Sequence, residues 1–291
     1  MLLGVNYNND NITFGNDVFV WTINEKLEKE ELERKEKEEY TETFIKKKLF
    51  GRYPQTKVTD TCLINSLKNI FDRNEYGYIE YNHQEYHEYN DDFYLVEPIK
   101  WKILEENNNM FCIMSEEILD RRLFYSSETN KNINGKVIYP NNYEYSDLRA
   151  WLNGYDESDY SVLNYANNGF IGIAFNKKEK EMIMESMIDN SAQSTRRLDN
   201  AYVCNDVKDK IYLMSYEEIS KIYFDNNDQR KANATGFAIA KVDNKYKSDL
   251  KYFWLLSPRY HDSTESYSKC NRLVDICKTD GIRPVLKLKI E

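Results

Sequence analysis

Residues with binding potential concentrate near the C-terminus of the sequence. Tryptophan and arginine often carry most of the energy of a protein interface, and nearby polar side chains can fix a ligand's orientation. We expect the ligand contacts to come from Trp254, Ser257, Arg259, Asp262, Arg272 and Asp280. Arg283, which lies between Ile282 and Pro284 in an expected strand, fits a buried, paired structural role at least as well. The set predicts recognition rather than catalysis.

Two cysteines in the same region offer a different chemistry. Cys270 and Cys277 are seven residues apart, and two neighbouring thiols could hold copper or cycle through a disulfide. The alternative is structural, with two small residues flanking a Leu-Val-Asp-Ile strand. The five cysteines include no Cys-x-x-Cys pair, which argues against a zinc ribbon or a thioredoxin-type motif. In a sequence without a secretion signal we expect them to be reduced.

The three histidines form no recognisable catalytic pattern. His83 and His87 are four residues apart, which on a helix could place both on one metal ion. The asparagines and tyrosines around them predict an exposed acidic loop instead. His261 is the remaining histidine, and the sequence has no nucleophile elbow, Gly-x-Gly-x-x-Gly loop or Walker motif. We therefore expect no catalytic residue, no metal and no cofactor.

Composition restricts the class of protein to which the chain can belong. Its 291 residues are 41% hydrophobic and 31% charged, which fits one large or two modest packed domains. A mean hydropathy of -0.77 and the lack of an apolar run of about 18 residues argue against a membrane protein, so a cytoplasmic location is expected. The net charge of -9 argues against nucleic acid as the main partner, because phosphate binding favours a basic surface.

The N-terminal segment, residues 1–48, differs from the rest of the sequence. Short strands are expected at residues 12–14 and 18–21, around a turn rich in asparagine and aspartate. Residues 25–49 read as a charged helix with glutamate four residues before lysine, as in Glu31 and Lys35. Its apolar positions are too sparse for a coiled coil, so we expect a solvated helix anchored at its C-terminal end. A helix that binds a partner is the alternative.

The elements after Pro54, which is expected to break that helix, mix helices and strands. Ser146, Asn176 and Ser215 are expected N-caps, and Glu218 completes a capping box. Helices are expected after Ser146 and over residues 61–71, 177–187 and 216–224, and strands over residues 76–81, 99–104, 111–114, 210–214, 253–256 and 282–290. Because these elements do not alternate as βαβ units, the sequence predicts an α+β fold.

Six ordered sequence blocks carry a resemblance to a known family. They are Gly51–Gln55, Pro98–Leu104, Leu148–Asn153, Ile211–Tyr216, Trp254–Pro258 and Gly281–Leu286. On these motifs, residues 51–290 resemble a bacterial family of domains of unknown function. That family is related to the C-type-lectin fold, in the branch that contains formylglycine-generating enzymes and the variable proteins of diversity-generating retroelements.

The resemblance implies a C-type-lectin-like α+β domain over residues 49–291, with short helices and antiparallel strands. It also implies a ligand surface built by the loops that precede the last strand. Leu256 stands where the family usually has arginine, and Arg259 could replace that arginine only if the loop geometry allows it.

The resemblance does not extend to the metal or cysteine chemistry of these relatives. Calcium-dependent sugar binding is not implied, because Glu97–Ile99 and Trp151–Asn153 do not supply the oxygen ligands of that site. Formylglycine-generating enzymes use a cysteine pair near the C-terminus. Cys270 and Cys277 lie in a similar region, but their flanking residues do not match that enzyme signature.

Three functions follow from these observations. The first is a non-catalytic, calcium-independent module that recognises a protein or peptide through the face between Trp254 and Asp280. The second is a cysteine-dependent oxidase using Cys270 and Cys277. The third is a structural or assembly component that docks a partner on the charged helix. The identity of the ligand and the oligomeric state stay open.

Overall fold

The computed structural model describes residues 17–126, 129–133, 135–155, 165–166, 168–190, 205–224, 230–242, 251–260, 263–267, 273–275 and 279–290. The chain divides into two compact units, one of residues 1–46 together with Glu291 and one of residues 47–290. In the described part of the chain, no helix combines the length and the apolar character needed to cross a membrane. The strand expected at residues 12–14 lies outside the described residues.

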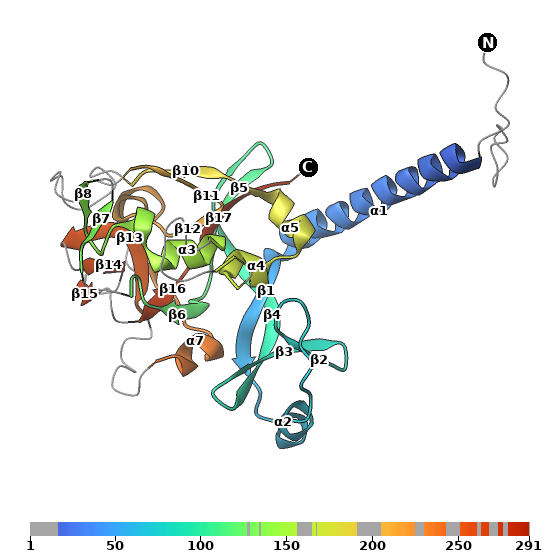
Figure 1. The fold of residues 1–291 in the computed structure, drawn as a ribbon, viewed down its shortest axis with the longest axis horizontal. Helices are drawn as coiled ribbons and strands as arrows, with labels where there is room; N and C mark the ends of the chain where they lie inside the picture. The colour runs from blue at the N-terminus through green and yellow to red at the C-terminus, as the bar shows by residue number, and fades with distance from the viewer. Residues whose placement is uncertain are drawn as a thin grey trace, which may run out of the picture. The chain divides into compact units, whose positions relative to one another are not determined.

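The first unit is represented by one long helix, α1 (Asp17–Lys47) (Figure 1). The expected strand at residues 18–21 is wrong, because these residues are helical. No glycine or proline occurs between Asp17 and Lys47, so nothing in the sequence stops the helix before this β-branched and aromatic stretch. The expected pair of Glu31 and Lys35 is present at 2.9 Å, and both side chains are exposed. The helix ends at Lys47, before Pro54, and Lys48 adopts a left-handed φ of 58°.

The second unit contains short helices and many strands. Its described helices are α2 (Thr61–Leu67), the 3-10 helix η1 (Tyr143–Tyr145), α3 (Asp147–Asn153), α4 (Phe170–Ala174), α5 (Lys177–Met182), the π-helix η4 (Glu218–Ile222) and α7 (Gly236–Ala240). Its described strands are β1 (Leu49–Lys57), β2 (Ile79–Tyr81), β3 (Gln84–Tyr89), β4 (Asp92–Asn107), β5 (Met110–Ser115), β6 (Asp120–Arg122), β7 (Lys131–Ile133), β8 (Lys136–Ile138), β9 (Ile183–Met184), β10 (Ser186–Ile188), β11 (Val207–Asp209), β12 (Ile211–Tyr212), β13 (Phe253–Tyr260), β14 (Ser263–Tyr267), β15 (Leu273–Asp275), β16 (Asp280–Ile282) and β17 (Val285–Lys289). The unit is a mixed α+β structure with mostly antiparallel sheets, as the sequence predicts.

The larger sheet has eight strands in the order β12-β17-β5-β4-β3-β2, with β1 added to β4 and β9 added to β17 (Figure 1). The 16-residue strand β4 runs through its middle and pairs with β1, β3 and β5. Its antiparallel pairing with β5 confirms the hairpin expected between residues 99–104 and 111–114. The last strand, β17, pairs with β5 on one side and with β12 on the other.

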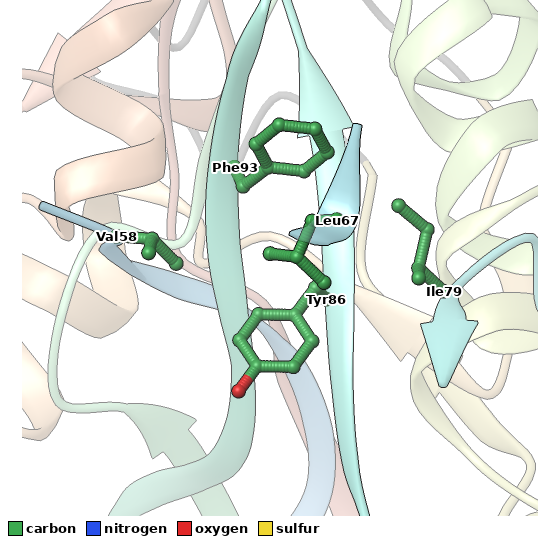
Figure 2. Packing of buried hydrophobic residues seen from close by; sticks show 5 residues of the cluster. All are labelled: Val58, Leu67, Ile79, Tyr86 and Phe93. Carbon is green, nitrogen blue, oxygen red and sulfur yellow. The ribbon is translucent and has the colours of Figure 1, made fainter. Parts of the chain in front are cut away.

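The expected exposed loop around His83 and His87 is wrong, because His87 lies on β3 of a hairpin. The turn of this hairpin places Asn82 and His83 at φ values of 51° and 62°, the left-handed geometry that two-residue hairpin turns favour. The alternation of tyrosine with polar residues therefore continues through β3 rather than stopping at residue 81. Figure 2 shows the buried cluster that β3 shares with α2 and its neighbours: Val58, Leu67, Ile79, Tyr86 and Phe93.

The second sheet has five strands in the order β15-β14-β13-β16-β6. The neighbours β13 and β16 run parallel, with Phe253 opposite Gly281, whereas β16 and β6 run antiparallel. Gly281 is required by close packing, because a Cβ there would lie 2.3 Å from the carbonyl oxygen of Tyr252 and 2.7 Å from the Ile118 side chain. In this sheet β16 lies next to β6, and β13 lies one strand further away.

The expected helix caps are confirmed, although the helices are shorter than expected. The Ser146 hydroxyl accepts from the Arg149 N–H at 3.1 Å, and Asn176 and Glu179 form a full capping box. Ser215 and Glu218 also exchange the two hydrogen bonds of a capping box, at 3.1 Å and 2.7 Å. The helix after Asn176 ends at Met182 rather than 187, because the following residues pair in β9 and β10.

Candidate functional site

Three of the six residues expected to contact a ligand are buried in the second sheet. Trp254 is 1% exposed, and its indole N–H donates to the Arg122 carbonyl at 2.8 Å. The buried Ser257 hydroxyl accepts from the Tyr216 N–H at 2.7 Å. The buried Asp280 carboxylate pairs with Arg121 at 3.2 Å. These three side chains support the fold, and they offer no exposed surface to a ligand.

The other predicted contacts are not described by the structure. Arg259 lies in β13, but the position of its side chain is not described, and Asp262 and Arg272 lie outside the described residues. The same holds for Cys270 and Cys277, on which the oxidase hypothesis rests.

Two further motif positions belong to the core. Leu256 is fully buried in β13, and its N–H donates to the Met214 carbonyl at 3.0 Å, so leucine suits this position. Arg283 is buried as the structural alternative predicts, and it donates to backbone carbonyls that include Ser115 at 2.8 Å.

A pocket of about 350 Å3 is lined by residues of β6, of α3 and of the end of α7. Its wall combines aromatic rings, cations and a single carboxylate, which are Tyr89, Trp151, Tyr165, Arg121, Arg122, Lys241 and Asp147. The volume falls at the lower end of the range typical of small-ligand sites, about 300–1,000 Å3. We take this pocket as the candidate site because its wall brings cations and aromatic rings together.

The Arg122 guanidinium is the most exposed cation of the pocket wall. Its central carbon lies 4.1 Å from the centre of the Trp151 ring, and 31% of its side chain is exposed. Its Nε lies 3.4 Å from a carboxylate oxygen of Asp120, but the geometry does not make a hydrogen bond, and Nε has no hydrogen-bond partner in the described structure. The indole therefore holds the guanidinium in place from one side while about a third of the Arg122 side chain stays exposed.

The buried carboxylate of Asp120 organises the groups behind Arg122. It accepts from the Tyr53 hydroxyl at 2.7 Å, from Lys241 at 2.5 Å and from the Arg121 N–H at 2.6 Å. Burial alone would raise the pKa of Asp120, but the charges of Lys241 and Arg122 outweigh it and hold the pKa below its ordinary value. Burial lowers the pKa of Lys241, although Asp120 opposes the shift. The carboxylate therefore fixes two cations of the wall at once.

Trp151 is positioned by the buried contacts of helix α3. The Arg149 side chain makes three contacts of 2.8 to 3.0 Å with Asp209 of β11, and both side chains are almost completely buried. The Asn153 side chain donates to the Ile211 carbonyl at 2.8 Å and accepts from the Ile211 N–H at 3.0 Å. The Leu-Arg-x-Trp-Leu-Asn block thus joins α3 to β11 and β12, which leaves Trp151 as a rigid wall of the pocket.

A second hollow, of about 690 Å3, lies at the β2–β3 turn. Its cation, Arg52, stacks on Tyr76 at 4.3 Å and donates to both carboxylate oxygens of Glu85. Glu85 also accepts from the Asn74 side chain at 2.7 Å. Arg52 thus makes two hydrogen bonds with its own carboxylate, whereas the ion pair of Arg122 with Asp120 has no hydrogen bond from Nε.

The histidine spacing does not form a metal site. His83 lies in the hairpin turn, whereas the His87 ring packs against the rings of Tyr78 and Phe237 at 5.9 Å and 5.2 Å. Among the described residues there is no cluster of histidine, cysteine and acidic side chains able to hold a metal ion.

Sequence reasoning missed the residues that line the pocket. Asp120-Arg121-Arg122 is a run of three charged residues between the apolar residues Leu119 and Leu123. Such a run inside an apolar stretch was the local sequence signal for this part of the site. Lys241 and Tyr89 carry no comparable local signal. Two of the residues predicted to contact a ligand instead contact residues of the pocket wall. The Trp254 indole N–H donates to the Arg122 carbonyl, and Asp280 accepts from the Arg121 side chain.

The comparisons with known proteins place most of the second unit in one family. No match to the chain was found among curated proteins or among solved structures. The model of the family described as "Domain of unknown function (DUF6273)" matches residues 107–290, which include β6, α3, α7 and the C-terminal sheet. The first two motif blocks, at residues 51–55 and 98–104, precede the matched region. The chain therefore belongs to the family of domains of unknown function named DUF6273.

Proposed function

We propose that the chain is a non-catalytic, calcium-independent recognition module that binds a protein or peptide in the pocket whose wall includes Arg122 and Trp151. We call this site the Arg122 pocket. The observation that carries the proposal is the guanidinium of Arg122, held flat on Trp151 at the wall of a concave site. Arginine and tryptophan are the residues that most often dominate binding energy at interfaces. A pocket of this size takes one side chain or one chain end of a larger partner.

A C-type-lectin-like architecture is part of the same proposal. The short helices, the mostly antiparallel sheets and the last strand β17, paired between β12 and β5 of the larger sheet, support it. In this proposal the ligand face is not at Trp254 but at the pocket lined by Arg121 and Arg122 of β6. Contacts from Arg259, Asp262 and Arg272 remain predictions, as does the role of α1 in assembly.

Selection from a displayed library of random peptides tests the proposal. The wild-type chain should enrich peptides whose affinity falls at least about tenfold for Arg122→Gln, the loss of a charged hydrogen-bond donor. Arg52→Gln is the matched control, since it removes an arginine that is also stacked and ion-paired but lines the other hollow. Peptides that bind Arg122→Gln as tightly as the wild type, or a failure to enrich any peptide, would refute the proposal.

A further inference from the structure

We infer that the group taken by the Arg122 pocket is a carboxylate adjoining a flat apolar side chain, such as a peptide chain end with an aromatic last residue. This inference rests on the proposed binding function and specifies its chemistry. The first argument comes from the donors at the pocket wall. Nε1 of Trp151, a residue that lines the pocket and is 1% exposed, is buried without a hydrogen-bond partner in the described structure. Nε of Arg122 also makes no hydrogen bond there, although it lies 3.4 Å from a carboxylate oxygen of Asp120. Buried donors of this kind favour an oxygen acceptor, because an unmade hydrogen bond is costly.

The second argument comes from the shape of the cation. A guanidinium stacked on a ring through its face directs its N–H groups sideways, in its own plane. A carboxylate is planar and can accept two such N–H groups in parallel, which makes it a better match than a tetrahedral oxyanion. The partly exposed Arg122 is the cation that an entering group would meet, because Arg121 is only 2% exposed at its side chain and Lys241 14%.

The third argument comes from the charge of the whole cluster. Arg121 has its own carboxylate, Asp280, whereas Lys241 and Arg122 share Asp120. Asp147, the one carboxylate of the wall, accepts from the Ser126 N–H at 2.8 Å. The three cations and three carboxylates of the cluster sum to zero, so the cluster has no excess positive charge to stabilise the two charges of a phosphate, and a single negative charge facing Arg122 is the better match.

The fourth argument comes from the remaining wall, which is aromatic and aliphatic. Tyr89, Tyr165, Leu123 and Leu148 line it together with Trp151. A flat apolar group next to the carboxylate would cover these side chains and remove their surface from water. The carboxylate can come from a chain end or from an aspartate or glutamate side chain, and the two sources require separate probes.

The test uses the full chain labelled with 5-fluorotryptophan and followed by fluorine NMR. The chain has four tryptophans, and the Trp151 signal is assigned as the one missing from Trp151→Phe. The probes are N-acetyl-phenylalanine for a chain end, N-acetyl-aspartyl-phenylalaninamide for an acidic side chain, N-acetyl-phenylalaninamide as the neutral control, and phenyl phosphate for the dianion.

At least one of the two carboxylate probes should shift the Trp151 signal saturably, and the one that binds more tightly identifies the source. The neutral amide should bind at least about tenfold more weakly, because it cannot form the charged hydrogen bonds to Arg122. Arg122→Gln should abolish the difference between acid and amide, and Arg52→Gln should preserve it. The acid–amide comparison is made on the wild type, so it stands even if Arg122→Gln does not fold.

Three results would overturn the inference: equal binding of acid and amide, tighter binding of phenyl phosphate, or no shift of Trp151 with any probe. None of these results decides the proposed function, which the library selection tests separately. Selected peptides that need Arg122 for binding but have no carboxylate at the contact would refute the inference that the pocket binds a carboxylate. They would still support the proposed binding function. Failure of the selection together with failure of all probes would reject both.

Discussion

Removing one partner of the buried pair Arg149 and Asp209 should destabilise the second unit far more than removing both partners. The Arg149 side chain is 4% exposed and the Asp209 side chain 0%, and the two make three contacts of 2.8 to 3.0 Å. Burial opposes the charge of Arg149, but the bonds and charge of Asp209 outweigh it and raise the pKa of the guanidinium. Each partner therefore depends on the other to be buried in charged form.

The magnitude follows from the groups left without a partner. Arg149→Met or Asp209→Leu should each lower the free energy of unfolding by about 3–5 kcal/mol, because an uncompensated charge stays buried. The double variant removes both charges and restores apolar packing, but it removes the donor to the Glu144 carbonyl, which accepts from Arg149 at 2.8 Å, and the carboxylate that accepts from the Tyr155 hydroxyl at 2.8 Å. That loss is about 1–2 kcal/mol, so the double variant should be more stable than either single variant.

Urea unfolding, followed by circular dichroism and tryptophan fluorescence, measures the four free energies of this double-mutant cycle. The coupling energy should be at least about 3 kcal/mol. Lys57→Met is the control in the same unit, since Lys57 pairs with Asp92 at 2.6 Å while both side chains are about half exposed. It should cost at most about 1 kcal/mol. Additive losses in the cycle, or single losses as small as the control, would refute the reasoning.

Three other predictions concern His87, Gly281 and Trp254. Burial lowers the pKa of His87 from 6.5 to about 4, with the charges of Lys241 and Arg73 adding to the shift and Asp120 opposing it. As the pH falls, the histidine is protonated in the unfolded chain before it is protonated in the folded one. The free energy of unfolding should therefore fall by at most about 3 kcal/mol between pH 6.5 and pH 4. In His87→Phe the urea midpoint should depend less on pH over this range, and an unchanged dependence would contradict the assignment to His87. Gly281→Ala should cost about 1–3 kcal/mol or more, because its Cβ would meet the Tyr252 carbonyl at 2.3 Å, and an unchanged melting temperature would speak against this packing. Trp254→Phe should lower the free energy of unfolding by about 1–3 kcal/mol, because the Arg122 carbonyl loses the indole N–H as its donor. The same variant should bind a carboxylate probe more weakly. A variant as stable as the wild type and with normal binding would show that the Trp254 contact does not support the pocket.

Local features of the structure could be predicted from the sequence, because their causes lie within a few residues. The caps of Ser146 and Asn176 and the capping box of Ser215 and Glu218 each join residues three apart, and the structure contains all of them. The β4–β5 hairpin was predictable for the same reason. The helical state of residues 18–21 was not, because β-branched and aromatic residues favour strands unless a neighbouring helix extends through them.

The site could not be predicted in the same way, because its contacts join distant parts of the chain. Trp254 was expected at a ligand face, and the structure instead places its indole against a carbonyl 132 residues away. A tryptophan suits a core as well as an interface, and only that distant contact decides between them. The pairing of Lys241 with Asp120, which are 121 residues apart, likewise leaves no trace in the local sequence.

The long strand β4 has a consequence for how the family's common region holds together. The matched residues begin at residue 107, where β4 ends, so β4 itself and its partners β1 and β3 precede the shared region. A shortened chain starting at residue 107 would leave β5 as a bare edge, and it would remove the Tyr53 hydroxyl from Asp120. Exposed edges of this kind invite aggregation. The compact unit of this chain, residues 47–290, is thus longer than the matched segment, and we expect a fragment that starts at residue 107 to aggregate more readily than the whole unit.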